Sequence, residues 1–394
     1  MKKKFFTYPI AATLVLCWTF FPNINPCLAG DTISVGVVTG LTGWGADLGA
    51  SVKEGVNLAV EEINNNGGLL GNNIEVIYRD DESNPPKGIV AARELIYAKK
   101  VDVLLGPSFT TVNFAILPVI NEAKILNLTL ATGTAIVNPQ KNPYTFRSNF
   151  HSKIEAEAAI NYAVKQKGHQ KLAILHDSSA YGKSGLAEIL ALLKKEGLAA
   201  LTIETYNIGD KNMTGQLLKI KQTGATAVLA WGLGPDLAVV AKNMHTLGLN
   251  LPVYGGSGSN SRFFKKLAGD LGENFLGALT KNFTFNQKNP LPVRAKRYMD
   301  EITKRYGLNR SSILSNSAHS YDAMYIYAQA VKKAGTVEKT KVKAAMENLR
   351  YQGLTAETVF SPSDHEALDA SDMAMAYSAG WIPEGAFNRP DDID

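Results

Sequence analysis

Two short runs of hydroxyl-bearing residues and glycines are the clearest candidates for binding chemistry. Residues 106–111 (GPSFTT) and 131–134 (ATGT) each follow an apolar, β-branched run. Threonines at a helix start can cap it, and free N–H groups at that end attract anions. For either run alone, plain capping without a ligand is an equal alternative. Two neighbouring donor loops favour capture of a carboxylate, since each hydrogen bond to a charged group is worth ~1.5–3 kcal/mol.

Residues later in the chain could form a second wall. Tyr181 and Ser257 follow later strands, with Trp231 and Leu233 between them. Aromatic and apolar side chains commonly line ligand pockets. Each of them could equally belong to the core.

Catalytic and metal-binding motifs are incomplete. Tyr181–Ser184 resembles the end of a phosphate-binding loop, but Asp177 stands where that loop needs glycine. Residues 255–259 (GGSGS) approach a nucleophile elbow, except that the last position is Ser259. The six histidines show no metal-ligand spacing. We therefore expect a binding protein that is not an enzyme and needs no metal or cofactor.

The elements that must position these loops alternate between strand and helix. The predicted strands are 33–41, 74–80, 101–105, 125–130, 172–176, 201–206, 227–231 and 251–255. The predicted helices are 52–63, 87–99, 111–122, 154–167, 183–196, 214–222, 236–247, 293–306, 320–334 and 339–347. Apolar strands alternating with helices indicate parallel sheets covered on both faces. This α/β pattern predicts two doubly wound lobes divided near residue 150, with ligands at the carboxyl ends of the strands.

The first 29 residues have the form of a secretory signal peptide. Lys2–Lys4 form a basic start, residues 10–21 are mostly apolar, and Cys27-Leu28-Ala29 offers a small-x-small cleavage site. The apolar run is shorter than the ~20 residues of a membrane span, which argues against a retained anchor. Leu16 and Pro26 precede the two cysteines, an unfavourable context for lipidation. We expect cleavage near Ala29 and an exported protein that is free in solution.

Charge argues against a nucleic-acid partner. The chain has 41 Lys and Arg against 36 Asp and Glu, a net charge of +5. Removing the three lysines of the signal peptide leaves 38 against 36, or +2. A nucleic-acid-binding protein usually shows a concentrated basic stripe, and this sequence shows none.

Several motifs together resemble one family. They are residues 55–64 (GVNLAVEEIN), Gly67-Gly68, Gly71, Asp80-Asp81, Pro85, 105–107 (LGP), 176–177 with 181–182, and 360–365 (FSPSDH). Across the whole mature chain this combination is similar to the leucine/isoleucine/valine-binding proteins. The resemblance implies the solute-binding component of an ABC importer, partnered by membrane permease subunits and monomeric. It also implies a type I periplasmic binding fold with a three-segment hinge, the lobes being 31–150 plus 281–355 and 151–280 plus 356–394.

The resemblance also implies a site. The family's carboxylate donors fall on Thr110, Ala131 and Gly133, and because Gly133 replaces a threonine, Thr132 and Thr134 are possible substitutes. The remaining pocket walls implied by the resemblance are Leu48, Ser108, Phe109, Tyr181 and Leu233. Leu48 and Leu233 replace tyrosines, so the pocket differs from the amino-acid pattern.

Ser257 is the largest departure from the family. Amino-acid-binding relatives place a glutamate there to pair with the ligand's ammonium, and serine carries no such charge. A buried ammonium without its partner costs about 3–5 kcal/mol. This favours an amine-free acid, aromatic or aliphatic, unless Asp47, Asp177 or Asp322 compensates.

Two other functions compete with solute transport. A receptor of the same fold could report its ligand to a separate membrane partner. A secreted hydrolase could use Ser257 or His176. No recognisable spacing assembles a base, a nucleophile and an orienting group, which disfavours the hydrolase.

Overall fold

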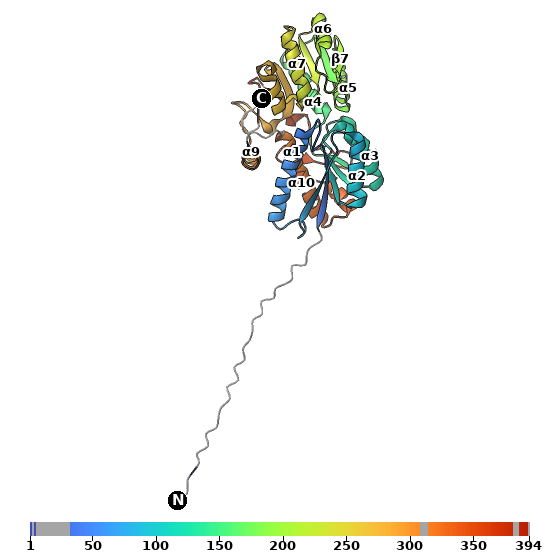
Figure 1. Cartoon of the computed structure of the whole chain (residues 1–394), viewed down its shortest axis with the longest axis vertical. Coiled ribbons are helices and arrows are strands. Elements are labelled where there is room, and N and C mark those ends of the chain that lie inside the picture. Colours follow the sequence, from blue (N-terminus) through green and yellow to red (C-terminus); the bar gives the residue numbers. More distant parts are fainter. Residues whose placement is uncertain (2–3, 5–31, 308–313, 381–385, 393–394) are drawn as a thin grey trace.

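The computed structural model describes residues 1, 4, 32–307, 314–380 and 386–392, apart from the side chains of Arg262 and Leu314. The predicted signal peptide, 1–29, therefore lies almost entirely outside the described residues. The rest forms two lobes, one above the other in Figure 1, each built around its own sheet. No helix among the described residues has the length and apolar character that crossing a membrane requires.

The first lobe contains a five-stranded parallel sheet. Its strands are β1 (Ile33–Thr39), β2 (Ile74–Asp80), β3 (Val103–Leu105), β4 (Leu126–Thr129) and β5 (Thr145–Arg147). They lie in the order β2-β1-β3-β4-β5. The second lobe holds β6 (Leu172–Asp177), β7 (Ile203–Tyr206), β8 (Ala227–Trp231), β9 (Val253–Gly255), β10 (Phe275–Thr280) and β14 (Met373–Tyr377). Their order is β14-β10-β9-β8-β6-β7.

Helices cover both sheets. They are α1 (Ala46–Asn65), α2 (Pro85–Arg93), α3 (Thr110–Ala123), α4 (Ser152–Ile160), α5 (Ala180–Lys195), α6 (Thr214–Gln222), α7 (Gly234–Thr246), α8 (Arg262–Ala268), α9 (Val293–Tyr306), α10 (Leu314–Ala334) and α11 (Lys339–Met346). The apolar stripe predicted at Val52, Val56, Ala59 and Ile63 is buried on α1, which packs against α10. The two-lobe α/β fold expected from the sequence is confirmed.

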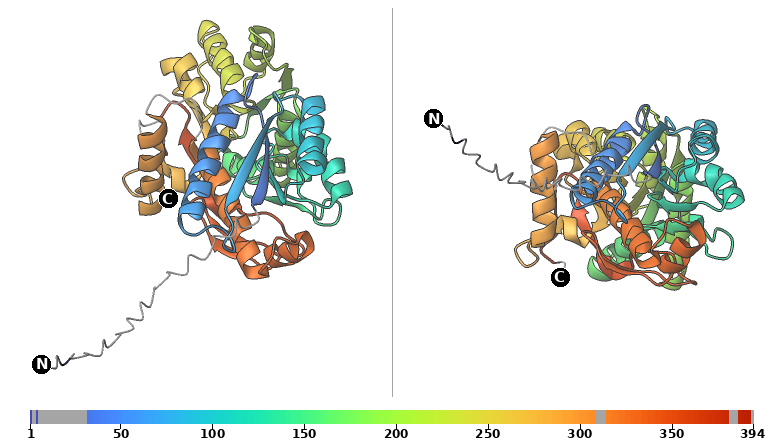
Figure 2. Two further views of the ribbon diagram at one scale, coloured as in Figure 1. Left: turned by 60° about the horizontal axis from the view of Figure 1, so that its bottom comes forward. Right: turned by 90° about the horizontal axis from the view of Figure 1, so that it is seen from below.

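Two pairs of short strands complete the structure. β12 (Arg350–Gln352) pairs with β13 (Glu357–Val359), and β11 (Thr284–Phe285) pairs with β15 (Phe387–Asn388). The second pair places the C-terminal end beside α9, as Figures 1 and 2 show.

One strand departs from the predicted parallel arrangement. β14 runs antiparallel to β10 at the edge of the second sheet. The chain comes to this edge from the first lobe after its last crossover, without the covering helix that would return it in the parallel direction. β5, β10 and β14 had no predicted counterpart, and neither did the four strands of the two short pairs or α8.

The chain crosses between the lobes three times. It leaves β5 for α4 near residue 150, returns after β10 near residue 280, and enters β14 at Met373. The last crossover was expected near residue 355, but contacts with the first sheet continue further. Glu366 bridges to Arg147 at the end of β5, and His365 Nδ1 donates to the Thr145 carbonyl at 3.1 Å.

Candidate functional site

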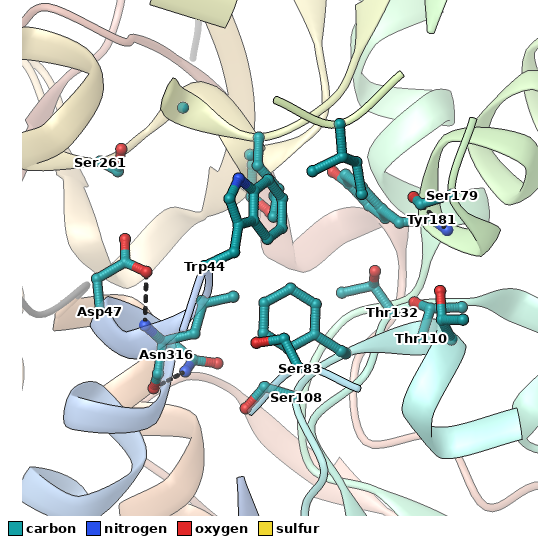
Figure 3. Close-up of a pocket in the computed structure, with 18 of the residues that line it drawn as sticks. Trp44, Asp47, Ser83, Ser108, Thr110, Thr132, Ser179, Tyr181, Ser261 and Asn316 are labelled. Carbon is teal, nitrogen blue, oxygen red and sulfur yellow. Dashed lines mark hydrogen bonds between the residues drawn. The ribbon is translucent and has the colours of Figure 1, made fainter. Parts of the chain in front are cut away.

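A cavity of about 550 Å³ lies between the lobes, at the carboxyl ends of both sheets (Figure 3). The first lobe and its hinge contribute Trp44, Asp47, Leu48, Glu82, Ser83, Ser108, Phe109, Thr110, Thr111, Thr132, Asn149, Phe150, Ser315, Asn316 and His319. The second lobe contributes Ser178, Ser179, Tyr181, Asn207, Ile208, Leu233, Gly234, Pro235, Ser257, Gly258 and Ser261. The lining thus combines aromatic rings with many hydroxyl groups, as expected of a small-molecule site.

Most of the residues singled out from the sequence meet at this cavity. Those that line it are Leu48, Ser108, Phe109, Thr110, Thr132, Tyr181, Leu233 and Ser257. Ala131, Gly133 and Thr134 lie just behind the lining. The amide of Ala131 donates to Thr129 Oγ1 at 3.1 Å, and that of Gly133 donates to Thr110 Oγ1 at 3.2 Å. Both amides are therefore already engaged within the first lobe.

The loop 131–134 is held from behind by Arg147. Its guanidinium is fully buried and donates to the carbonyls of Ala131 at 2.6 Å and Gly133 at 2.9 Å. Thr134 lies at the lobe boundary, where its amide donates to Ser184 Oγ of α5 at 3.2 Å. These bonds fix the loop whose Thr132 side chain faces the cavity beside Thr110 (Figure 3).

The start of α3 presents free donors to the cavity. Phe109 precedes the helix in extended conformation, and no side chain caps it. The first amides of a helix have no acceptor within the helix. The turn that leads from β3 into α3 depends on Gly106. Its φ of 87° is left-handed, and a Cβ at this position would clash with the Val38 carbonyl.

Two serines add hydroxyl groups beside the start of α3. Ser83 Oγ and Ser108 Oγ are buried and have no hydrogen-bond partner among the described residues. Figure 3 shows the two side chains close to each other on the first-lobe side of the cavity. A buried hydroxyl without a partner costs free energy, so a ligand that bonds to it gains an interaction.

An aromatic pair forms one wall. The rings of Trp44 and Phe109 lie 5.7 Å apart, tilted by 50°. Gly45 allows this contact, because a Cβ there would lie 2.0 Å from the Phe109 ring. Tyr181, at the start of α5, supplies an aromatic face from the second lobe and packs against Trp231 at 5.9 Å.

Glu155, a residue that sequence reasoning missed, lies behind the second-lobe wall. Its side chain is fully buried. Oε1 accepts from the Ser257 amide at 2.8 Å and from the Tyr181 hydroxyl at 3.3 Å. Burial raises the pKa of Glu155 to about 7, although these hydrogen bonds and the nearby Arg147 oppose the shift. The carboxylate thus holds two lining residues in place.

His319 joins two of the three crossovers. Its Nδ1 donates to the Ser148 carbonyl at 2.9 Å, which leaves Nε2 to accept from Thr280 Oγ1 at 3.0 Å. Ser148 follows β5 and Thr280 ends β10, so the ring ties α10 to both hinge segments. Burial lowers the pKa of His319 to about 3 and keeps the ring neutral.

Comparison with known proteins supports this architecture. Residues 32–380 match the family model for the periplasmic binding proteins. The chain belongs to this family. It is 27% identical to the Leu/Ile/Val-binding protein homolog 3 of Brucella melitensis, over 83% of this chain and 85% of that protein. It is 23% identical to the leucine-, isoleucine-, valine-, threonine- and alanine-binding protein of Pseudomonas aeruginosa, over 81% and 83%.

A solved structure supports the same assignment. The type 1 periplasmic binding protein from Bordetella pertussis superposes with a TM-score of 0.81 at 26% identity, over 88% of this chain and 96% of that one. The resemblance to the leucine/isoleucine/valine-binding proteins inferred from the sequence motifs is therefore confirmed. The Brucella and Pseudomonas relatives are both named for the solutes that they bind.

The three acids considered as substitutes for the family glutamate lie in different places in this periplasmic binding protein. Asp47 lines the cavity. Asp177 is buried beside the start of α5 and accepts from the Ser179 amide at 2.9 Å. Asp322 is buried near the hinge, where it accepts from the amides of Leu354 at 2.8 Å and Thr355 at 2.9 Å. Of the three, Asp47 alone lines the cavity.

Other lining residues of the binding protein had no signal in the sequence. Asn149 and Phe150 follow the three-residue strand β5, which is too short to show a pattern. Ser315 and Asn316 belong to the first turns of α10. These turns are polar, so the predicted helix began only at Ser320. The ring nitrogens of His176, a candidate in the hydrolase hypothesis, bond to Thr205 Oγ1 and the Asp177 carbonyl, outside the lining. The described residues contain no cluster able to ligate a metal ion.

Proposed function

We propose that this periplasmic binding protein captures a small carboxylate solute between its lobes and delivers it to the permease of an ABC transporter. The solute would be an amino acid or a related aromatic or aliphatic acid. The observation that carries the proposal is the uncapped start of α3, which faces the cavity together with the unpartnered hydroxyls of Ser83 and Ser108. The relatives named for binding branched-chain amino acids support the same class of solute.

The anion would be held without a cationic side chain. No lysine or arginine is among the described residues that line the cavity. The positive end of the α3 dipole and its free amides would supply the attraction, as at other helix N-termini. Because the amides of Ala131 and Gly133 already have acceptors, we assign the direct contacts to the start of α3, Ser83, Ser108, Thr110 and Thr132.

The second lobe would close over the solute. Tyr181 and Leu233 supply apolar contact, and α7 starts at Gly234 with no side-chain cap. A solute that touches both lobes binds the closed state more tightly and shifts the population toward it. The closed form would then be the one recognised by the permease. This role requires export to the periplasm, with cleavage of the signal peptide near Ala29.

Calorimetry on refolded, ligand-stripped protein tests the proposal. We expect heat of binding with at least one member of a panel of aliphatic and aromatic amino acids, benzoates and phenylalkanoates. A complete lack of binding across this panel would reject a small-carboxylate solute. Uptake of the bound solute by vesicles carrying the cognate permease would separate transport from a sensing role, since both predict the same binding heat.

A further inference from the structure

The charged side chains of the cavity are not balanced. Glu82 is paired, its carboxylate lying 2.5 Å from Lys87 Nζ. His319 is neutral because burial lowers its pKa to about 3. Asp47 has no ion pair with any described residue. It is therefore the one ionisable carboxyl of the described lining that lacks a positively charged partner.

The geometry of Asp47 leaves one oxygen for a ligand. Asp47 is the second residue of α1, and its Oδ1 accepts from the following amide, that of Leu48, at 2.9 Å. Oδ2 makes no hydrogen bond to a described residue. Figure 3 shows the carboxylate on the side of the cavity opposite Thr110 and Thr132, with the Trp44 ring between them. The acid and the anion-binding start of α3 therefore occupy opposite ends.

An amine-free acid would fit this charge pattern poorly. Its carboxylate would bring a second negative charge into a partly buried cavity that has no lysine or arginine in its described lining. A carboxyl removed from water needs a partner, and burial already raises the pKa of Asp47. A ligand that also carries a cation would satisfy Asp47, and the Trp44 face would add attraction.

We propose that Asp47 binds a cationic nitrogen of the solute, so that the solute is an ammonium carboxylate whose amine and carboxylate are separated by a carbon chain and held at opposite ends of the cavity. This inference rests on the proposed function, because the α3 end must hold the carboxylate. It assigns to Asp47 the counter-charge that the family resemblance led us to expect at position 257. Here Ser257 presents no charge. The nearby Glu155 is fully buried behind it and does not line the cavity; its Oε1 accepts two hydrogen bonds, and its Oε2 has no partner among the described residues.

A purely structural role predicts something different. An acid in the first turn of a helix stabilises the helix dipole whether or not a ligand is present. Asp47→Asn and Asp47→Ser would then lower thermal stability slightly and leave ligand preference unchanged. Recognition of a cation predicts the reverse: a loss confined to ligands that carry the amine.

The experiment compares matched pairs of solutes by calorimetry on ligand-stripped protein. The pairs are 4-aminobutanoate with butanoate, 5-aminopentanoate with pentanoate, and 6-aminohexanoate with hexanoate. The variants are Asp47→Asn and Asp47→Ser. Glu61→Gln serves as control, because Glu61 is an exposed acid of the same helix, paired with Arg305. Thermal unfolding verifies that each variant is folded.

We expect the amine-bearing member of at least one pair to bind more tightly than its partner. In both Asp47 variants that member should lose about 10- to 100-fold in affinity, the range for hydrogen bonds to a charged group. The amine-free partner should change little, as should every ligand with Glu61→Gln. Amine-free acids that bind equally well or better, or a preference that survives in the Asp47 variants, would overturn the inference while leaving the proposed function intact. No binding by any pair would also overturn the inference, whereas the proposed function is rejected only if the wider panel of acids fails to bind as well.

Discussion

The Nε atom of Arg147 lies 2.8 Å from Oε2 of Glu366, and the arginine is fully buried. This ion pair connects the last strand of the first sheet with the segment that leads into the third crossover. The same guanidinium donates to the carbonyls of Ala131 and Gly133 behind the cavity. The hinge and the ligand-facing loop therefore depend on one buried cation.

Glu366→Ala should lower the free energy of unfolding by about 3–5 kcal/mol, because it leaves Arg147 charged and unpaired in the interior. Urea denaturation followed by tryptophan fluorescence measures the change. Glu357→Ala is the matched control, since its partner Arg350 is exposed and such pairs contribute less than about 1 kcal/mol. Equal effects of the two substitutions would contradict the structural role of the Arg147–Glu366 pair.

Thr110→Ala should weaken solute binding by about tenfold or more. The substitution removes a hydroxyl at the α3 end and the acceptor of the Gly133 amide. Thr110→Ser keeps the hydroxyl and should retain most of the affinity, and Thr246→Ala, on the exposed end of α7, should change nothing. Calorimetry provides the measurement. Unchanged affinity in Thr110→Ala would place the anion elsewhere.

Glu155→Gln should change how stability depends on pH. Burial raises the pKa of Glu155 from 4.5 to about 7. The folded state therefore holds the proton more tightly, and the wild-type protein loses stability as pH rises from about 4.5 to 7. Glutamine cannot ionise, so the variant does not lose this stability. Across that pH window, its free energy of unfolding should rise relative to wild type by an amount on the order of 3 kcal/mol. Urea denaturation of both proteins at pH 5 and pH 8 measures this change. The same difference in free energy of unfolding at both pH values would contradict the raised pKa of Glu155.

His319→Gln should show the opposite trend. Burial lowers the pKa of His319 from 6.5 to about 3, so the unfolded chain takes up a proton more readily. The free energy of unfolding of the wild type therefore falls as pH drops below about 6.5, whereas glutamine does not titrate and adds no such pH dependence. The cost of the substitution should be largest at pH 7 and smaller at pH 4.5.

The sequence predicted the elements best where an apolar run or a helical spacing of apolar residues has sharp boundaries. The bounds of β2, β8 and α9 agree with the prediction at both ends. β5 went unnoticed because three residues carry no periodic signal, and its loss hid Asn149 and Phe150. In the same way, the polar first turns of α10 hid Asn316 and His319.

The sequence predicts only those lining residues of the cavity that the order of the strands brings together. The loops after β3 and β4 adjoin because those strands are neighbours in the sheet, so Thr110 and Thr132 could be expected together. The contact between Glu155 and Ser257 joins residues 102 positions apart and has no motif of its own. The engagement of the Ala131 and Gly133 amides likewise depends on side-chain directions that a sequence does not specify.

A crystal structure of the ligand-stripped protein, soaked with the solute that binds most tightly in calorimetry, tests the central claim most directly. The account predicts a closed cavity in which the carboxylate accepts hydrogen bonds from the first amides of α3 and from the hydroxyl of Ser108 or Thr110. A solute whose carboxylate contacts only the second lobe, or one bound outside the interlobe cavity, would contradict it.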